Sequence, residues 1–216
     1  MRLSVVLILC CVIMSCNDSM PESHAVYVLI DRTGLYAQSF DDVRATTRVL
    51  LSKLEPGDSL AIARIDNELF SVEDVVVAVT FSSRPSNANK QKRALLNAVD
   101  KMMSATDVGS YTDITGGMLQ ATEWLNTTRA THKLIIVFSE FPDEPRAGYM
   151  REFPVNFNNA VVMVWNVTTS LPGNGVTLTE SSSFSERAMA WQSRVMAGGG
   201  RWRVINNTAE IMSVIE

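Results

Sequence analysis

The stretch Tyr27-Val28-Leu29-Ile30-Asp31-Arg32-Thr33-Gly34 joins an apolar run to a carboxylate, a hydroxyl and a glycine. A short apolar run bounded in this way predicts a buried β-strand that ends in an oxygen-rich loop. In open α/β sheets, ligands bind beyond the carboxyl ends of the strands. We therefore expect a ligand site immediately after this strand, with Asp31 and Thr33 as its first candidate residues.

Two later segments repeat this combination. The stretch Tyr111-Thr112-Asp113-Ile114-Thr115-Gly116-Gly117 opens an amphipathic segment, and Leu134-Ile135-Ile136-Val137-Phe138-Ser139-Glu140 is an apolar run that ends in a hydroxyl and a carboxylate. Each polar residue has a structural explanation when taken singly, since Asp31 could hold a turn and Thr112 could cap a helix. Together, oxygen atoms from three loops at one sheet edge suit a hard divalent cation such as Mg²⁺.

Apolar strand patterns alternate with helical patterns along the rest of the chain. The run 75–81 follows its predecessor closely, which favours an antiparallel edge strand, and the helical spacing that ends at residue 197 is stopped by Gly198-Gly199-Gly200. The pattern predicts one doubly wound α/β domain, with a mostly parallel sheet, one antiparallel edge strand and helices on both faces. The expected strands are 26–30, 60–65, 75–81, 134–138, 160–165 and 202–205, and helical spacing covers 43–54, 95–103, 114–125, 184–197 and a short terminal helix.

The three polar segments, in this order, resemble the von Willebrand factor type A (vWA) domain and its metal-ion-dependent adhesion site. The family's first motif is DxSxS, its second is a Thr that opens a later helix, and its third is an Asp at the end of a central strand. Asp31 and Thr33 match the first motif, and Thr112 matches the second. Glu140 stands where the third-motif Asp is expected. The resemblance covers the chain from about Val26 onward and implies a metal set of Asp31, Thr33, Thr112 and Glu140 around Mg²⁺ or another divalent cation.

One position departs from the family pattern. Leu35 stands where the family has a Ser that binds the metal directly, and a leucine has no donor atom. Asp113, Ser139 and Asp143 are alternative ligands nearby. Two functions stay open: a protein-binding module that engages an acidic group of a protein partner through a cation at a degenerate site, and a metal-free scaffold or assembly protein of the same fold.

A third hypothesis is a phosphatase of the haloacid dehalogenase type, because Asp31-Arg32-Thr33-Gly34 also resembles the nucleophile loop of those enzymes. That mechanism needs a later Lys and later Asp residues to hold the phosphoryl group and magnesium. The sequence has neither residue type after Asp143. His24 and His132 are expected far from the site, so a histidine base is excluded as well. We therefore expect a protein that is not an enzyme.

Residues 1–16 resemble a bacterial lipoprotein signal peptide. Arg2 gives a minimal positive start, the run 3–14 is almost wholly apolar, and Ile13-Met14-Ser15-Cys16 resembles a lipobox. Cys16 is then the acylated first residue of the mature chain, carrying fatty acids such as palmitate. The alternative is an uncleaved N-terminal anchor. Residues 17–24 are expected to form a short polar linker, and 25–216 the vWA-like domain.

Both interpretations of the leader place the domain in the cell envelope, at the periplasmic face of a bacterial membrane or on the cell surface. All three cysteines (Cys10, Cys11 and Cys16) lie in the leader, so the domain can form no disulfide, zinc-thiolate site or thiol nucleophile. The net charge of −4, from 19 basic and 23 acidic residues, argues against nucleic acid as a partner. We expect a monomeric domain, and we interpret Arg201-Trp202-Arg203 as a strand with flanking charges rather than a binding patch.

Overall fold

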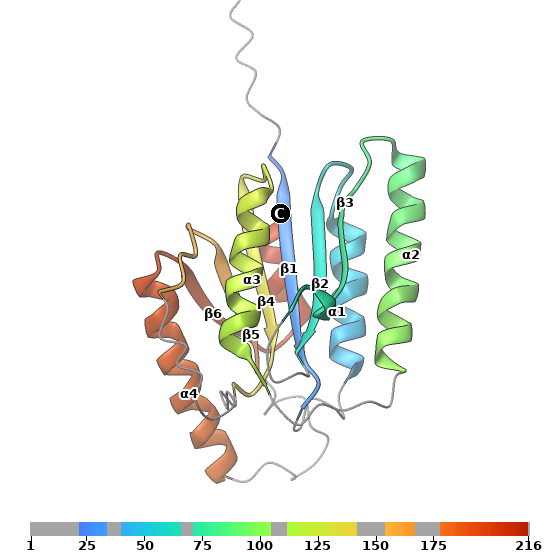
Figure 1. Cartoon of the computed structure of the whole chain (residues 1–216). Coiled ribbons are helices and arrows are strands. Elements are labelled where there is room, and N and C mark those ends of the chain that lie inside the picture. The colour runs from blue at the N-terminus through green and yellow to red at the C-terminus, as the bar shows by residue number, and fades with distance from the viewer. Residues whose placement is uncertain are drawn as a thin grey trace, which may run out of the picture.

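A six-stranded sheet with helices on both faces forms the protein (Figure 1). The computed structural model describes residues 22–33, 40–65, 71–104, 112–141, 154–166 and 178–215 of the 216-residue chain. The strands are β1 (His24–Asp31), β2 (Ser59–Ile65), β3 (Val75–Thr80), β4 (His132–Phe138), β5 (Val161–Trp165) and β6 (Arg201–Ile205). The helices are α1 (Phe40–Lys53), η2 (Val72–Asp74), α2 (Pro85–Met103), α3 (Ile114–Thr127), α4 (Leu178–Ala197) and α5 (Thr208–Ile215).

The strand order is β3-β2-β1-β4-β5-β6, and only β3 runs antiparallel to its neighbour. The doubly wound, mostly parallel sheet with one antiparallel edge strand is therefore confirmed. β1 lies at the centre, where Val28 is paired with Ile62 of β2 on one side and with Ile136 of β4 on the other. This position in the sheet explains why β1 and β4 are continuous apolar runs, because a central parallel strand is buried on both faces.

Helices α3 and α4 cover one face of the sheet, while α1, α2 and α5 lie on the other (Figure 1). Their inward residues complete one core with the strands, in which β1 and β4 are almost wholly buried. β6 is an edge strand, and three of its five residues are exposed. Within the described part of the chain, no helix has the length and apolar character needed to cross a membrane.

Several boundaries differ from those expected from the sequence. The largest difference is at α2, which begins at Pro85, ten residues before the expected start at residue 95. β1 begins at His24, which was expected to end the linker, and the amide of His24 donates to Asp58 Oδ1 at 2.7 Å. α4 begins at Leu178, six residues before the expected start at Phe184. The sequence did not indicate this first part of the helix, because the residues before Phe184 are mostly polar and show no apolar stripe. The predicted glycine stop of α4 is confirmed, because the helix ends at Ala197. Gly198 also lies close to another segment: a Cβ at this position would be 2.1 Å from the carbonyl oxygen of Val155.

Candidate metal site

The candidate residues meet where the central parallel strands end, at the lower edge of the sheet in Figure 1. Asp31 is the last residue of β1, and Ser139 and Glu140 directly follow β4. Thr112 and Asp113 immediately precede α3. Since β1 and β4 are adjacent and parallel, their carboxyl ends lie side by side, and the start of α3 is brought to the same place.

Four side chains form a continuous hydrogen-bonded group, which we call the hydroxyl cluster: Asp31, Thr33, Thr112 and Ser139. Asp31 Oδ1 accepts from the Thr33 amide at 2.8 Å and from the Thr33 hydroxyl at 2.6 Å. Asp31 Oδ2 accepts from the Ser139 hydroxyl at 2.6 Å. The hydroxyls of Thr33 and Thr112 are 2.6 Å apart and share a hydrogen bond. Residues 79 positions apart in the sequence therefore share one small polar site.

Three of the four cluster residues are buried and Thr33 is half-buried, and burial affects the pKa of the Asp31 carboxyl group. Asp31 and Thr112 are 1% and 3% exposed, and Ser139 is fully buried. Burial raises the pKa of Asp31 above its ordinary value, because a carboxylate loses its hydration there, while the hydrogen bonds from Ser139, Thr33 and Thr112 act in the opposite direction. The ionised form of Asp31 is thus costly in the protein alone, and a nearby cation would stabilise it.

At the end of β4, the Ser139 hydroxyl contacts Asp31. Ser139 Oγ also accepts from the amide of Phe141, whose φ of 55° marks a sharp turn directly after the strand. Glu140 is half-buried, and its main-chain carbonyl accepts from Arg187 Nε of α4 at 2.8 Å. Sequence reasoning missed Arg187, because a single arginine on an amphipathic helix carries no motif.

Asp113 has a structural role at the start of α3. It is the N-cap of α3, where its buried side chain accepts from the amide of Gly116 at 2.8 Å. This contact satisfies one of the unpaired amides of the first helical turn. The capping role that the sequence suggested for Thr112 thus belongs to Asp113, and Thr112 is left to join the hydroxyl cluster.

The chemistry of the cluster fits a hard cation. Hydroxyl and carboxylate oxygens are donors that Mg²⁺ and Mn²⁺ accept. The described residues contain no group of three or more His, Cys, Asp or Glu side chains that could hold a metal, so any ion here would depend on hydroxyls. Leu35 and Asp143 lie outside the described residues, and so does Cys16.

Comparison with known proteins supports the fold. No protein-family model matches the sequence, and no curated protein matches it significantly. A von Willebrand factor type A protein from Catenulispora acidiphila matches with a TM-score of 0.51 and 14% identity, over 90% of this chain and 41% of that one. The pilus adhesin SpaC from Lactobacillus rhamnosus GG matches with a TM-score of 0.53 and 11% identity, over 90% of this chain and 30% of the adhesin.

At these identities the similarity shows the fold alone, and this chain spans less than half the length of either structure. The vWA-like architecture predicted from the sequence is confirmed. The metal-binding role of individual residues stays a prediction.

Proposed function

We propose that this chain, whose fold is that of von Willebrand factor type A domains, is an exported, membrane-anchored protein-binding module that engages an acidic group of a protein partner through a divalent cation. The observation that carries the proposal is the hydroxyl cluster, in which three hydroxyls and one carboxylate from three separate segments converge at the end of the central strands. A binding role without enzymatic activity is part of this proposal.

In this proposal, the residues of the cluster have different roles in binding an ion such as Mg²⁺. The hydroxyl oxygens of Thr33 and Thr112 are neighbours and are the direct donors. Asp31 supplies the compensating negative charge, and Ser139 fixes the orientation of its carboxylate. With a single carboxylate in the cluster, a divalent cation keeps net positive charge there, which favours an acidic group of the partner as a further ligand.

One observation favours a second candidate, the metal-free scaffold. Both oxygens of the Asp31 carboxyl group already accept hydrogen bonds from neighbouring hydroxyls, so the cluster is satisfied without an ion. Leu35 also favours the metal-free scaffold, because a leucine lacks the oxygen donor that the family pattern has at this position. In this case a partner would bind through surface contacts, and the cluster would serve only to tie three segments together.

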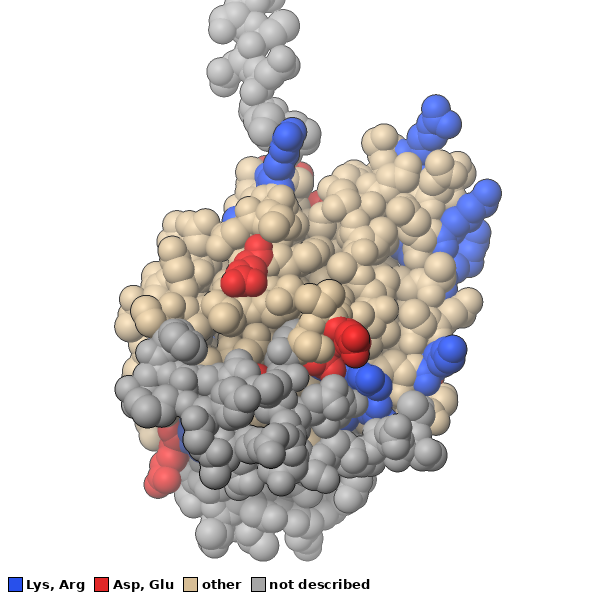
Figure 2. All heavy atoms as spheres, in the orientation of Figure 1, with Lys and Arg blue, Asp and Glu red and all other residues tan. Residues whose placement is uncertain are grey.

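The cellular location is proposed from the leader. Residues 1–16 serve as a lipoprotein signal peptide, residues 17–24 as the linker into β1, and residues 25–216 as the domain. Cys16 carries the lipid, and the domain lies at the periplasmic face or on the cell surface. On the face shown in Figure 2, the Lys and Arg side chains lie mostly along the side formed by α2. The acidic net charge of −4 supports a protein partner rather than a nucleic acid.

A magnesium titration followed by thermal melting separates the two candidates. The full chain, purified in dodecyl maltoside and treated with EDTA, should melt at a higher temperature as MgCl₂ is added at constant ionic strength. An ion that binds only the folded state adds about 2.7 kcal/mol when its concentration is a hundred times Kd. Asp31→Ala should remove the rise, and Leu35→Ser should enlarge it by restoring an oxygen donor. If neither the wild type nor Leu35→Ser responds to Mg²⁺, the scaffold replaces the metal-dependent module.

A further inference from the structure

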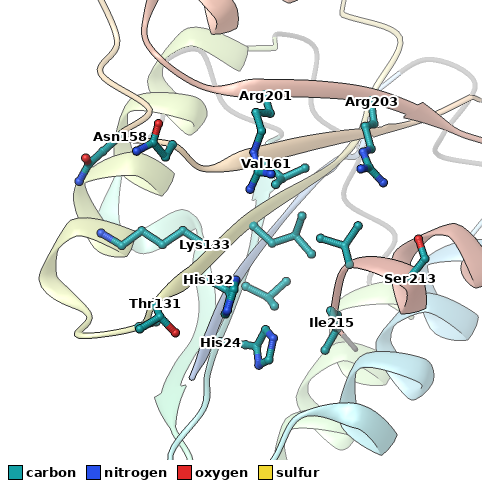
Figure 3. A pocket seen from close by; sticks show the side chains of 15 residues that line it. His24, Thr131, His132, Lys133, Asn158, Val161, Arg201, Arg203, Ser213 and Ile215 are labelled. Atoms are coloured by element: carbon teal, nitrogen blue, oxygen red, sulfur yellow. The ribbon is translucent and has the colours of Figure 1, made fainter. Parts of the chain in front are cut away.

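A hollow of about 610 Å³ lies at the opposite end of the sheet from the hydroxyl cluster (Figure 3). It is bordered by the first residues of β1, β4, β5 and β6 and by the last turn of α5. Val26, Leu134 and Val161 are cross-strand neighbours in register, so they form an apolar floor on one face of the sheet. Val214 and Ile215 of α5 add an apolar wall.

Two arginines of β6 stand over this floor. Arg201 is paired with Val161, and Arg203, two residues further, projects from the same face of the strand. Figure 3 shows both side chains directed from β6 toward the hollow. Both residues are exposed, and among the described residues the structure shows no hydrogen bond or ion pair to either guanidinium group. Two adjacent arginines are thus available to one ligand.

The other basic side chains of the hollow have partners. His24 and His132 stack with ring centroids 5.1 Å apart, and each has a carboxylate nearby: Asp58 at 3.8 Å and Glu22 at 3.9 Å. Lys133 donates to Asn126 of α3 at 3.1 Å. No Asp or Glu is among the described residues that line the hollow. The unshared positive charge therefore belongs to Arg201 and Arg203.

We propose that this hollow binds a phosphate group through Arg201 and Arg203, and that the phosphate is the headgroup of an anionic phospholipid. Guanidinium groups bind phosphate oxygens through paired, charge-assisted hydrogen bonds. The apolar floor beside the arginines suits a ligand in which the phosphate is attached to an apolar body, and this favours a lipid over a free ion.

The position of the hollow supports the lipid as the source, in a step that rests on the proposed lipid anchor. His24 lines the hollow and follows Cys16 by eight residues. An extended chain spans at most about 3.5 Å per residue, so an acylated Cys16 would keep the hollow within about 30 Å of the bilayer. Phosphate binding itself does not depend on the anchor.

A simpler explanation of the two arginines must be tested at the same time. Charged side chains on an exposed edge strand prevent other strands from pairing with it. That function needs no ligand, and its loss would appear as association of the chain. The experiment therefore includes the oligomeric state of each variant, measured by size-exclusion chromatography with light scattering.

The test uses the full chain in dodecyl maltoside and follows its melting temperature at constant ionic strength. The ligands are short-chain phosphatidylglycerol, short-chain phosphatidylcholine and inorganic phosphate. The variant is Arg201→Gln with Arg203→Gln. The matched control is Lys90→Gln with Arg93→Gln, which removes the same charge from exposed positions of α2.

Phosphatidylglycerol should raise the melting temperature of the wild type and of the control, and phosphatidylcholine should not. The arginine variant should need about ten times more lipid for the same shift, since charge-assisted hydrogen bonds are lost. An equal response to inorganic phosphate would overturn the lipid source and leave free phosphate as the ligand. An unchanged response in the arginine variant, or an equal loss in the control, would overturn the site. A variant that only associates, with no ligand response in the wild type, would establish the edge-protection role instead.

Discussion

At the scale of single residues, Asp31 decides how the candidate site behaves. Its carboxyl group is almost fully buried and accepts from the hydroxyls of Thr33 and Ser139. Burial raises the pKa of this group, because ionisation inside the folded protein deprives the carboxylate of its hydration and costs free energy. A bound cation offsets that cost, whereas the protein without an ion carries it unrelieved.

This cost predicts a pH-dependent effect of Asp31→Asn in the presence of EDTA. A carboxyl group whose pKa is raised in the folded state loses stabilising free energy as pH rises from its unfolded pKa, near 4, through its folded pKa. The asparagine variant lacks this loss. The free energy of unfolding of the variant minus that of the wild type should therefore be larger at pH 7 than at pH 4. Urea unfolding at both pH values measures the difference.

Asp41→Asn, at an exposed position of α1, is the matched control and should follow the wild type. An Asp31→Asn variant that loses stability on going from pH 4 to pH 7 as steeply as the wild type would contradict the assignment of the cost to Asp31.

At the scale of the elements, two neighbouring residues at the start of α3 have different roles. Asp113 caps the helix through the amide of Gly116, and Thr112 contacts Thr33 in the cluster. The helix thereby places Thr112 beside the end of β1, although α3 and β1 are far apart in the sequence. Asp113 is thus needed for the position of Thr112 without being part of the cluster.

We predict that Asp113→Ala lowers the free energy of unfolding by about 1 kcal/mol, because the helix loses its side-chain cap. Asp113→Asn should lose much less, since asparagine is also a good N-cap. Urea unfolding of both variants measures these changes. Asp113→Asn should also keep the magnesium response of the wild type, and its loss in this variant would make Asp113 a metal ligand.

The sequence allowed the elements to be predicted, but not all of their contacts. Continuous apolar runs predicted β1 and β4, and Gly198 predicted the end of α4, because each depends on local residue type. The contact between Ser139 and Asp31 is accompanied by a turn at Phe141, whose amide donates to the Ser139 hydroxyl oxygen. A positive φ is uncommon for phenylalanine, so no sequence pattern indicated that turn. The hollow beside β6 was missed because it depends on pairing across four strands.

At the scale of the whole molecule, the two candidate sites lie at opposite ends of the sheet. The hydroxyl cluster lies at the carboxyl ends of β1 and β4, and the basic hollow lies where these strands begin. With a lipid on Cys16, the chain enters β1 at the end with the hollow. The two proposed sites would then bind a phospholipid headgroup and a protein partner at once, with the partner's site directed away from the membrane.

This arrangement requires that Cys16 carries the lipid. We predict that Cys16→Ser, expressed as the full chain, releases the domain from the membrane fraction or leaves its leader uncleaved. Cys11→Ser is the control and should behave as the wild type, because it changes another leader cysteine without touching the acylation position. Membrane fractionation and the mass of the purified chain are the measurements. A Cys16→Ser variant that matures and stays in the membrane fraction with an unchanged lipid mass would refute the anchor.

The most direct test of the account is whether the hydroxyl cluster holds a divalent ion. Free Mn²⁺, which accepts the same oxygen donors as Mg²⁺, can be measured by electron paramagnetic resonance as it is added to the full chain. Thr112→Val removes a hydroxyl of the cluster with little change of shape. Thr122→Val makes the same substitution in α3 at a buried hydroxyl that bonds only within the helix. We predict uptake of one Mn²⁺ per chain by the wild type and by Thr122→Val, and at least a tenfold weaker uptake, about 1.4 kcal/mol, by Thr112→Val. No uptake by the wild type, or equal uptake by Thr112→Val, would contradict the account.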